Sequence, residues 1–342
     1  MTAQLTEVVL PGIVEPDGLR VVNRPIPLPG KGQVLVRVEA TGVSFAELSM
    51  RRGRYYDQPP FPFVPGYDLV GIVDAVGAGV DPTMAGRRVA ALTKTGGWTT
   101  HAIVDATDLV DVPAGVEPAA AETVVTNGIT AWQMLHRRAR IRSGQTILVH
   151  GANGGVGNTL AQLASIAGAR VIGTASARHH DALRALGVTP IDYRTEDVPA
   201  RVRELAPDGV DAVFDNVGGD NITDAWHLLR RGGTLVSYGV AAVQDGTGSA
   251  MLPVVRVLAR MWWWNAAPNG RGAYFYNLWA GRRFTHGRFV ARLRADLTAV
   301  FDLIATGRLT AQIAATLPLS RTADAVKLAE SRTAVGKVVL IP

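Results

Sequence analysis

A cluster of glycines between an apolar run and a helical pattern is the part of the sequence with the clearest chemical meaning. Ile147 to Val149 lead into "ANGGVG", Ala152 to Gly157, and apolar residues then recur at helical spacing. In a dinucleotide-binding turn, glycines permit the tight turn, admit the pyrophosphate close to the backbone, and let helix pack on strand. The pyrophosphate lies at the positive end of that helix. The stretch predicts a dinucleotide site formed by Gly154, Gly155, Val156 and Gly157.

The next predicted strand, "ARVIGTAS", discriminates between the two common nicotinamide dinucleotides. An NAD-specific site has an acidic residue at the end of this strand, where it holds the ribose 2′-hydroxyl. This chain has Ser176 there, followed by Arg178. A carboxylate would repel a 2′-phosphate, whereas these two side chains would donate hydrogen bonds to it, with His179 and His180 as further contacts. We therefore expect NADP(H), and the alternative is an exposed loop with no part in binding.

Length and composition indicate a two-domain globular protein and do not exclude an enzyme. The chain has 342 residues, of which 47% are hydrophobic and 19% charged. It contains no cysteine, which excludes disulfides, thiolate zinc sites and a cysteine nucleophile. The N-terminal residues lack the pattern of a secretion signal, and no apolar run approaches the roughly 20 residues that span a bilayer. A cytoplasmic protein without a membrane partner is expected.

The net charge of +6 raises the question of a nucleic-acid partner. Most arginines are dispersed along the chain. The densest cluster is Arg282, Arg283, Arg288, Arg292 and Arg294. A face for nucleic acid is one interpretation, but we favour a solvated or subunit-facing helix, and no nucleic-acid partner is expected.

The pattern of expected secondary structure changes twice along the chain. Residues 1–122 consist of short strands and turns, with Val34, Val36 and Val38 alternating against other residues. Residues 123–285 alternate strands with helices, which predicts a doubly wound parallel sheet. The remainder, about 286–342, contains a long helix ending near Gly307 and a closing strand, and we expect it to complete the first domain.

Several ordered motifs together resemble the medium-chain dehydrogenase/reductase superfamily, and within it the zinc-free NADPH:quinone oxidoreductase branch that includes zeta-crystallin. The motifs are "GVSFAELSMRRGRYYDQPPFPFVPGYDLVGIV", "VHGANGGVGNTLAQLA", "IDYR", "VFDNVGG" and "VGKVVLIP". The resemblance implies an α/β protein with a GroES-like β-barrel catalytic domain and a Rossmann domain with a doubly wound parallel sheet. It also implies a homodimer.

The resemblance adds further cofactor contacts. Those to the 2′-phosphate fall on Ser176, Arg178 and Tyr193, and Lys337 matches another contact to the cofactor. The backbone near Val217 and Gly239 is expected beside the nicotinamide. Thr130 matches a residue near the nicotinamide, and a helix-start residue is the alternative interpretation.

The catalytic residues are expected in the first domain. Zinc-dependent relatives carry a cysteine and Gly-His-Glu, whereas this chain has Gly66-Tyr67-Asp68 and no cysteine, so no metal site is predicted. The branch pattern "GxNxxD" appears as "GVSFAE", with Ser44 for Asn and Glu47 for Asp. Ser44 is a candidate hydrogen-bond donor. Glu47 is expected to orient other groups or to act as an N-terminal acid of a helix.

Without a metal, a conjugated acceptor is the easier substrate. Hydride added to the β-carbon of an enone, or to a quinone, moves negative charge onto an oxygen that hydrogen-bond donors stabilise. The resemblance places Tyr55 as that donor, with Tyr56 or a packing role for the ring as alternatives. His150 is expected to be a satisfied core residue, and Asp215 to organise its own turn.

The favoured function is a zinc-independent, NADPH-dependent reductase of quinones or α,β-unsaturated carbonyl compounds. One alternative is a biosynthetic enoyl reductase or reductive cyclase of a natural-product pathway. Another is a non-catalytic NADPH-binding protein, because a fold does not determine a function. The residues themselves do not name the physiological substrate.

Overall fold

The computed structural model describes residues 3–219, 221–239, 251–331, 333 and 335–342, and the chain divides into two compact units. Unit 1 comprises Met1–Ile129 and Gly281–Pro342, and unit 2 comprises Thr130–Ala280. Each unit has its own sheet and its own buried core. The chain therefore leaves unit 1, builds unit 2, and returns to unit 1.

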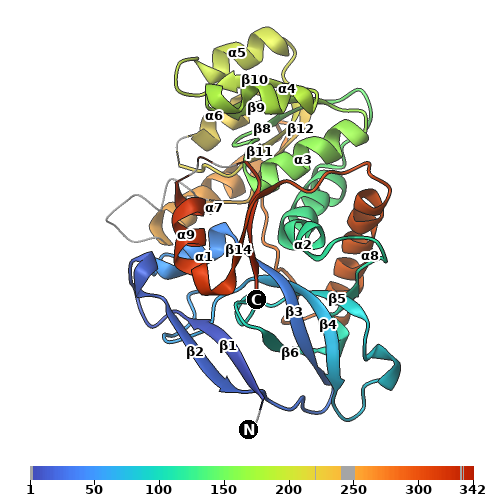
Figure 1. The fold of residues 1–342 in the computed structure, drawn as a ribbon. Coiled ribbons are helices and arrows are strands. Elements are labelled where there is room, and N and C mark those ends of the chain that lie inside the picture. The colour runs from blue at the N-terminus through green and yellow to red at the C-terminus, as the bar shows by residue number, and fades with distance from the viewer. Residues whose placement is uncertain (1–2, 220, 240–250, 332, 334) are drawn as a thin grey trace. The chain divides into compact units, whose positions relative to one another are not determined.

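Unit 2 is built on a parallel sheet in which the strand order is β10-β9-β8-β11-β12-β13 (Figure 1). Its strands are β8 (Thr146–Val149), β9 (Arg170–Ala175), β10 (Val188–Asp192), β11 (Val210–Asp215), β12 (Leu229–Ser237) and β13 (Gly272–Phe275). The first and fourth of these strands are neighbours at the centre. This is the strand order of a doubly wound dinucleotide-binding sheet, in which ligands lie beyond the carboxyl ends of the strands.

Helices cover this sheet because the crossover between two parallel strands needs a long connection. They are α3 (Gly155–Ile166), α4 (His180–Ala185), α5 (Val198–Leu205), α6 (Asn221–His227) and α7 (Met251–Ala266). Helix α4 packs on β10, and α7 packs on β13. The buried apolar residues between helices and strands include Leu148, Ile172, Val213 and Met261. The core therefore holds the strand ends, and with them the site, in a rigid frame.

Unit 1 is β-rich and contains a seven-stranded sheet together with a two-stranded one. The larger sheet runs β14-β15-β3-β4-β5-β7, and β6 also pairs with β3. Its strands are β3 (Gln33–Val43), β4 (Asp68–Val76), β5 (Arg88–Leu92), β6 (His101–Asp105), β7 (Val110–Asp111), β14 (Ile313–Pro318) and β15 (Lys337–Ile341). β1 (Gln4–Val9) pairs with β2 (Arg20–Pro25). The C-terminal strands thus complete a sheet begun at the N-terminus.

The predicted alternation of valines in β3 corresponds to a buried face. Val34, Val36 and Val38 belong to one core cluster with Leu69 of β4 and Val89 of β5. A second cluster joins the C-terminal strand to this sheet through Val43, Trp98 and Leu340. The helices of unit 1 are α1 (Phe45–Arg51), α8 (His286–Ala305), α9 (Thr322–Glu330) and most of α2 (Pro118–Trp132).

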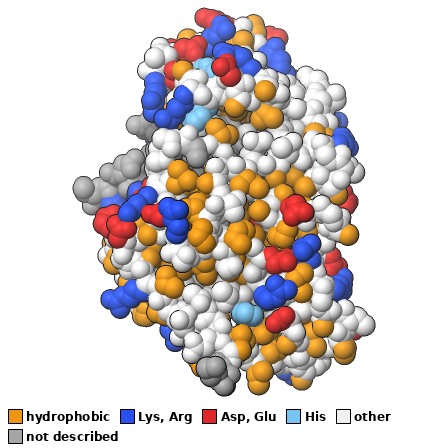
Figure 2. All heavy atoms as spheres, viewed as in Figure 1, with side chains coloured by type: hydrophobic (Ala, Val, Ile, Leu, Met, Phe, Trp, Pro, Cys, Tyr) orange, Lys and Arg blue, Asp and Glu red, His pale blue; other side chains and the backbone are white. Residues whose placement is uncertain are grey.

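On one face of the molecule, the basic residues are distributed among other side chains (Figure 2). Lys and Arg lie there interspersed with carboxylates and apolar groups. Within the arginine cluster near α8, Arg282 binds Asp108 at 2.8 Å, and Arg294 donates to the carbonyl of Thr107 at 3.2 Å. These arginines therefore tie α8 to the segment before β7. In the part of the chain that is described, no helix combines the length and apolarity needed to cross a membrane.

Candidate functional site

The glycine cluster forms the predicted strand, turn and helix. The turn begins at Gly151, whose φ of +64° lies in the left-handed region, and helix α3 begins at Gly155. A Cβ on Gly157 would lie 2.3 Å from the carbonyl oxygen of Gly151, so only glycine fits this crossing of helix and turn. Gly154 is the N-cap residue and supplies no side-chain cap. The first amides of α3 are thus left for an anion, as a pyrophosphate site requires.

The residues predicted for the 2′-phosphate lie at the ends of two neighbouring strands. Ser176 follows β9 and Tyr193 follows β10, and the preceding residues, Ala175 and Asp192, are paired in register. Ser176 is buried and is the N-cap residue of a short 3-10 turn that contains Arg178. Tyr193 is 54% exposed. Parallel strands therefore bring together two side chains that are 17 positions apart in the sequence.

Two arginines and one carboxylate complete this edge of the sheet. Arg178 is exposed and its Nε lies 3.2 Å from Nε2 of His179. Arg194, which the sequence analysis did not select, lies over the ring of Tyr193 at 5.8 Å from the centroid. Asp192 accepts a hydrogen bond from the amide of Arg194 at 3.0 Å, and such backbone hydrogen bonds lower the pKa of Asp192. The carboxylate thus organises the loop after β10.

The ends of the central strands carry a buried histidine and aspartate. Nδ1 of His150, just after β8, lies 2.8 Å from Oδ1 of Asp215 at the end of β11. Asp215 also accepts hydrogen bonds from the amides of Val217 at 3.2 Å and Gly218 at 2.9 Å. The expectations that His150 is a satisfied core residue and that Asp215 organises its own turn are both confirmed. The hydrogen bond from its amide to Asp215 therefore fixes the backbone at Val217.

Polar atoms without partners lie beside this turn. A Cβ on Gly239, which follows β12, would lie 3.0 Å from the carbonyl oxygen of Asn216. Oδ1 of Asn216 and the hydroxyl of Tyr238 are buried and make no hydrogen bond to any described residue. Burial and the nearby Asp215 raise the pKa of Tyr238, so its hydroxyl keeps its proton. Buried polar groups without partners are unusual and fit a site that a ligand completes.

Thr130 lies inside a helix rather than at its start. Helix α2 begins at Pro118, so the interpretation of Thr130 as a helix-start residue is wrong. Its side chain is buried. The role near the nicotinamide stays a prediction.

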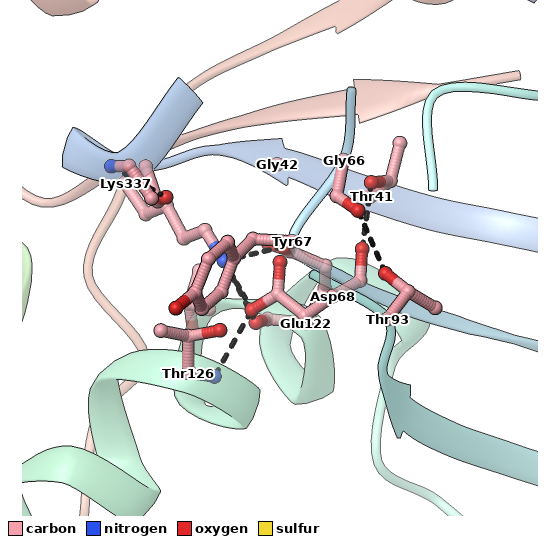
Figure 3. A network of polar contacts seen from close by, with 12 residues as sticks. Thr41, Gly42, Gly66, Tyr67, Asp68, Thr93, Glu122, Thr126 and Lys337 are labelled. Atoms are coloured by element: carbon pink, nitrogen blue, oxygen red, sulfur yellow. Dashed lines mark hydrogen bonds and ion pairs between the residues drawn. The ribbon is translucent and has the colours of Figure 1, made fainter. Parts of the chain in front are cut away.

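Lys337 is the centre of a buried cluster in unit 1, shown in Figure 3. Its ammonium lies 2.7 Å from Oδ2 of Asp68 and 2.5 Å from Oε1 of Glu122. The amide of Thr126 donates to the same Asp68 oxygen at 3.0 Å. Gly42 leaves room for the cluster, because a Cβ there would lie 2.4 Å from both Lys337 and Glu122. The cofactor contact expected for Lys337 stays a prediction, and its ammonium has two carboxylate partners here.

Burial and attraction between opposite charges act against each other in this cluster. Burial opposes the charge of Lys337, but attraction to Asp68 and Glu122 prevails and raises its pKa above the ordinary value. Burial raises the pKa of Glu122 well above its ordinary value, against the attraction of Lys337. Lys337 is therefore a buried cation between the carboxyl groups of Asp68 and Glu122. Such a cluster is stable only while all its members are present.

Ser44 and Glu47 form a capping box at the start of α1. Ser44 is the N-cap residue, and its amide donates to Oε2 of Glu47 at 3.0 Å. Its hydroxyl bonds the same carboxyl group. Glu47 also accepts a hydrogen bond from the amide of Tyr67 at 2.7 Å. Ser44 and Glu47, the two residues that differ from the branch pattern, therefore act together. They cap the start of α1 and hold the turn before β4.

Glu47 is a buried carboxyl group that titrates close to neutral pH. It is 2% exposed. Burial raises its pKa to about 7, the hydrogen bond from Ser44 opposes this, and the charge of Asp68 adds to it. Glu47 is thus partly protonated at neutral pH, which fits the expected role of orienting other groups.

Tyr55 lies in a small group of tyrosines. Its hydroxyl is 2.8 Å from the hydroxyl of Tyr67, and the two rings meet edge to face with centroids 6.3 Å apart. The ring of Tyr56 is 4.7 Å from that of Tyr55, centroid to centroid, and is 48% exposed. Burial, and next the neighbouring Tyr67, raise the pKa of Tyr55. Tyr55 therefore keeps its proton at neutral pH and can donate a hydrogen bond.

Neither Tyr67 nor the partners of Lys337 were selected from the sequence. The signal for Tyr67 was present, because "GYD" departs from the Gly-His-Glu of zinc-dependent relatives. Nothing in the sequence pairs Lys337 with Asp68 and Glu122. In the described ranges, no three His, Asp or Glu side chains are grouped in a way that would hold a metal ion.

The comparisons with known proteins agree with this architecture. Residues 30–114 match the alcohol dehydrogenase GroES-like domain, and residues 186–340 match the zinc-binding dehydrogenase family. The human synaptic vesicle membrane protein VAT-1 homolog is 34% identical over 345 residues, which cover 98% of this chain and 86% of that protein.

Solved structures show the same fold over the whole length. The mycobacterial protein Rv1454c complexed with NADPH is 31% identical, with a TM-score of 0.82 over 99% of this chain and 100% of that one. A quinone oxidoreductase of Pseudomonas syringae pv. Tomato DC3000 is 27% identical, with a TM-score of 0.84 over 99% and 100%.

Fold and site together define a dinucleotide-dependent oxidoreductase built from a GroES-like domain and a Rossmann domain, as the sequence predicted. The chain belongs to the medium-chain dehydrogenase/reductase superfamily, in its zinc-free quinone oxidoreductase branch.

Proposed function

We propose that this protein is a reductase that uses NADPH to deliver hydride to a conjugated acceptor, either a quinone or an α,β-unsaturated carbonyl compound. The observation that carries the cofactor assignment is the register of β9 and β10, which places Ser176 beside the position of Tyr193. Arg178 follows in the turn after β9, and that strand ends without a carboxylate. This set of donors suits a phosphate on the ribose 2′-oxygen.

The residues present also fit the rest of the dinucleotide. The uncapped start of α3 and the glycine turn before it would hold the pyrophosphate. The backbone at Val217 and Gly239, with the orphaned polar atoms of Asn216 and Tyr238, would hold the nicotinamide end. Support comes also from the mycobacterial relative that was solved with NADPH. When bound, NADPH supplies the hydride.

The residues of unit 1 favour a conjugated acceptor. Addition of hydride to such a substrate leaves negative charge on an oxygen, and a hydroxyl aimed at that oxygen stabilises the charge. Tyr55 is the proposed hydrogen-bond donor because its hydroxyl stays protonated at neutral pH and is paired with another hydroxyl. The quinone oxidoreductase of Pseudomonas syringae is consistent with this substrate class. We propose the neighbouring Ser44 and Glu47 as supports for the segment that carries Tyr55.

We further propose that the reaction needs no zinc. Asp68 follows Tyr67 in the tripeptide that is Gly-His-Glu in zinc-dependent relatives, and its carboxylate is neutralised by Lys337. An ammonium bonded to that carboxylate opposes the binding of a divalent cation there, because like charges repel at short range. The family name of the C-terminal match therefore need not describe this chain.

A homodimer in the cytoplasm is the proposed form of the enzyme. Strand β13 is the last strand of the described sheet of unit 2 and pairs with β12 on one side. An unpaired strand edge is a template for another strand, and a second copy of the chain would cover it. Light scattering coupled to size-exclusion chromatography measures the mass directly, and a monomer at micromolar concentration would contradict the proposal.

The function is tested by measuring NADPH and NADH oxidation by the purified protein with alkenals, cyclic enones, quinones and saturated ketones. We expect turnover of the conjugated acceptors with NADPH, and little with NADH or with saturated ketones. Equal use of NADH would contradict the cofactor assignment. Tight NADPH binding without turnover of any compound would instead favour a dedicated biosynthetic enoyl reductase or cyclase, or a binding protein.

A further inference from the structure

We propose that Tyr67 is a positioning residue for the reaction, whose hydroxyl orients the Tyr55 hydroxyl toward the substrate oxygen and strengthens the hydrogen bond that Tyr55 donates to it. The inference rests on the proposed function, in which Tyr55 donates to that oxygen. It starts from one contact, the distance of 2.8 Å between the two hydroxyl oxygens. The sequence analysis selected Tyr55 but assigned nothing to Tyr67.

Tyr67 is buried, and hydrogen bonds fix its backbone. It is 5% exposed, and its amide donates to Glu47 at 2.7 Å. Its carbonyl oxygen accepts hydrogen bonds from the amides of Thr93 at 2.9 Å and Lys94 at 3.1 Å. The backbone of Tyr67 is thus bonded on both sides.

The residues on either side of Tyr67 add to this rigidity. Gly66 has a φ of +107°, and a Cβ there would lie 2.4 Å from the amide nitrogen of Trp98. Asp68 bonds Lys337 and the amide of Thr126, and its carbonyl accepts from the hydroxyl of Thr41 at 2.7 Å (Figure 3). The backbone that carries the Tyr67 ring is therefore held in place. A residue that orients a catalytic group must itself be held in this way.

Tyr55 differs, because it follows α1 in a loop and is only partly buried. A phenol hydroxyl rotates and can point its proton in several directions. If the fixed hydroxyl of Tyr67 donates to the oxygen of Tyr55, the proton of Tyr55 must point elsewhere, either toward the adjacent Tyr56 or toward a substrate oxygen that takes its place. The pair therefore converts a rotating hydroxyl into a directed donor.

The step adds one hydride and one proton to the acceptor. Bound NADPH would supply the hydride for the new C–H bond at the β-carbon, and the electrons of the carbon–carbon double bond would then lie on the oxygen as an enolate. Tyr55 would donate a hydrogen bond to that oxygen and keep its own proton. Water would protonate the α-carbon, which gives the saturated carbonyl compound and hydroxide. A hydrogen bond that Tyr67 donates to the Tyr55 oxygen strengthens the hydrogen bond that Tyr55 donates onward.

A double-mutant cycle tests the inference. We expect Tyr55→Phe to lower kcat about 100-fold and Tyr67→Phe about 10-fold, with small changes in KM, because the Tyr55 hydroxyl acts on charge that develops in the transition state and Tyr67 directs that hydroxyl. The double variant should fall within about twofold of Tyr55→Phe, because Tyr67 acts through Tyr55. A Tyr67→Phe variant with the kcat of the wild type, or a double variant in which the two losses multiply, would overturn the inference.

A matched control separates the hydroxyl pair from the turn that carries it. Thr93→Val removes the hydrogen bond of 2.7 Å from the Thr93 hydroxyl to the carbonyl of Gly66, but leaves both tyrosine hydroxyls. We expect the kcat of this variant to stay within about threefold of the wild type, because only a neutral hydrogen bond in the turn is lost. A loss as large as that of Tyr67→Phe would show that loosening the turn is sufficient, and the inference would be wrong.

Binding of a stable anion gives a readout that does not depend on turnover. With NADP⁺ present, 4-nitrophenolate imitates an enolate, and its absorbance reports binding. We expect Tyr55→Phe and Tyr67→Phe each to weaken its affinity at least about fivefold, as loss of a charge-assisted hydrogen bond does. Unchanged affinity in Tyr67→Phe would overturn the inference. A wild type that reduces no compound of the panel would overturn the proposed function separately, and the titration would still decide the inference.

Discussion

The ammonium of Lys337 lies 2.7 Å from the carboxylate of Asp68, although 269 positions separate the two residues in the chain. Glu122 is the third member of this cluster, and all three side chains are buried. The contact joins the last strand of the chain to β4 and to α2 within unit 1. We therefore expect this contact to stabilise unit 1, whether or not Lys337 also binds the cofactor.

Lys337→Met should lower the free energy of unfolding by about 3–5 kcal/mol, because it leaves the Asp68 charge buried without its partner. Chemical denaturation of the variant measures this. Lys327→Met is the matched control, because Lys327 pairs with Asp17 at the surface, and its melting temperature should hardly change. If Lys337→Met instead keeps its stability and loses NADPH affinity, the lysine acts mainly as the predicted cofactor contact.

Glu47 should make stability depend on pH. Its pKa is raised by burial from 4.5 to about 7, so between these values the unfolded chain loses a proton that the folded chain keeps. The contribution of Glu47 is thus fully present below pH 4.5 and is lost as pH rises through 7, by about 3 kcal/mol in all. Denaturation of the wild type and of Glu47→Gln from pH 5 to pH 8 measures it. A difference between the two that is constant with pH would contradict the raised pKa.

Arg178→Ala should weaken NADPH binding about tenfold or more and leave NADH binding nearly unchanged, because the guanidinium is assigned to the 2′-phosphate. Fluorescence titration with both cofactors measures the two affinities. Arg184→Ala serves as the control, since Arg184 is an exposed arginine nearby that pairs with Asp181 at 2.8 Å. Equal weakening of NADPH and NADH by Arg178→Ala would remove the 2′-phosphate assignment.

Substitution by alanine should have different effects on stability at two glycines of the cofactor turn. In Gly157→Ala the new Cβ would lie 2.3 Å from a backbone oxygen, so the turn must shift, and we expect loss of both stability and NADPH binding. In Gly154→Ala the nearest atom would be 3.4 Å away, so the melting temperature should be kept. Its NADPH affinity should still fall, because a methyl group stands where the backbone approaches the pyrophosphate. Two variants with the same melting temperature would contradict this account.

Chelation should leave the activity unchanged, because Lys337 rather than a metal ion neutralises Asp68. Dialysis against a strong chelator, followed by the NADPH oxidation assay and by metal analysis of the protein, measures this. A loss of activity that zinc restores would show that a metal site exists and was missed.

Local patterns in the sequence were sufficient for the β-rich and α/β character of the two parts of the chain and for the dinucleotide turn. The valine alternation of β3 and the strand–turn–helix at Gly151 to Gly157 are both present, because hydrophobic period and glycine placement act over a few residues. The same holds for the helix that ends before Gly307. Thr130 shows the limit, since its place inside α2 depends on where that helix begins, and helix ends are weakly marked in a sequence.

The sequence by itself determined the β-rich and α/β halves of the chain, the cofactor turn, and the residue types offered to a 2′-phosphate. Only the tertiary structure decided that Tyr67 meets Tyr55, that Ser44 and Glu47 cap a helix, and that Lys337 lies between Asp68 and Glu122. The physical reason is separation along the chain. Periodicity reports which face of an element is buried, whereas a contact between distant side chains depends on how strands pair and on the space that residues such as Gly42 leave.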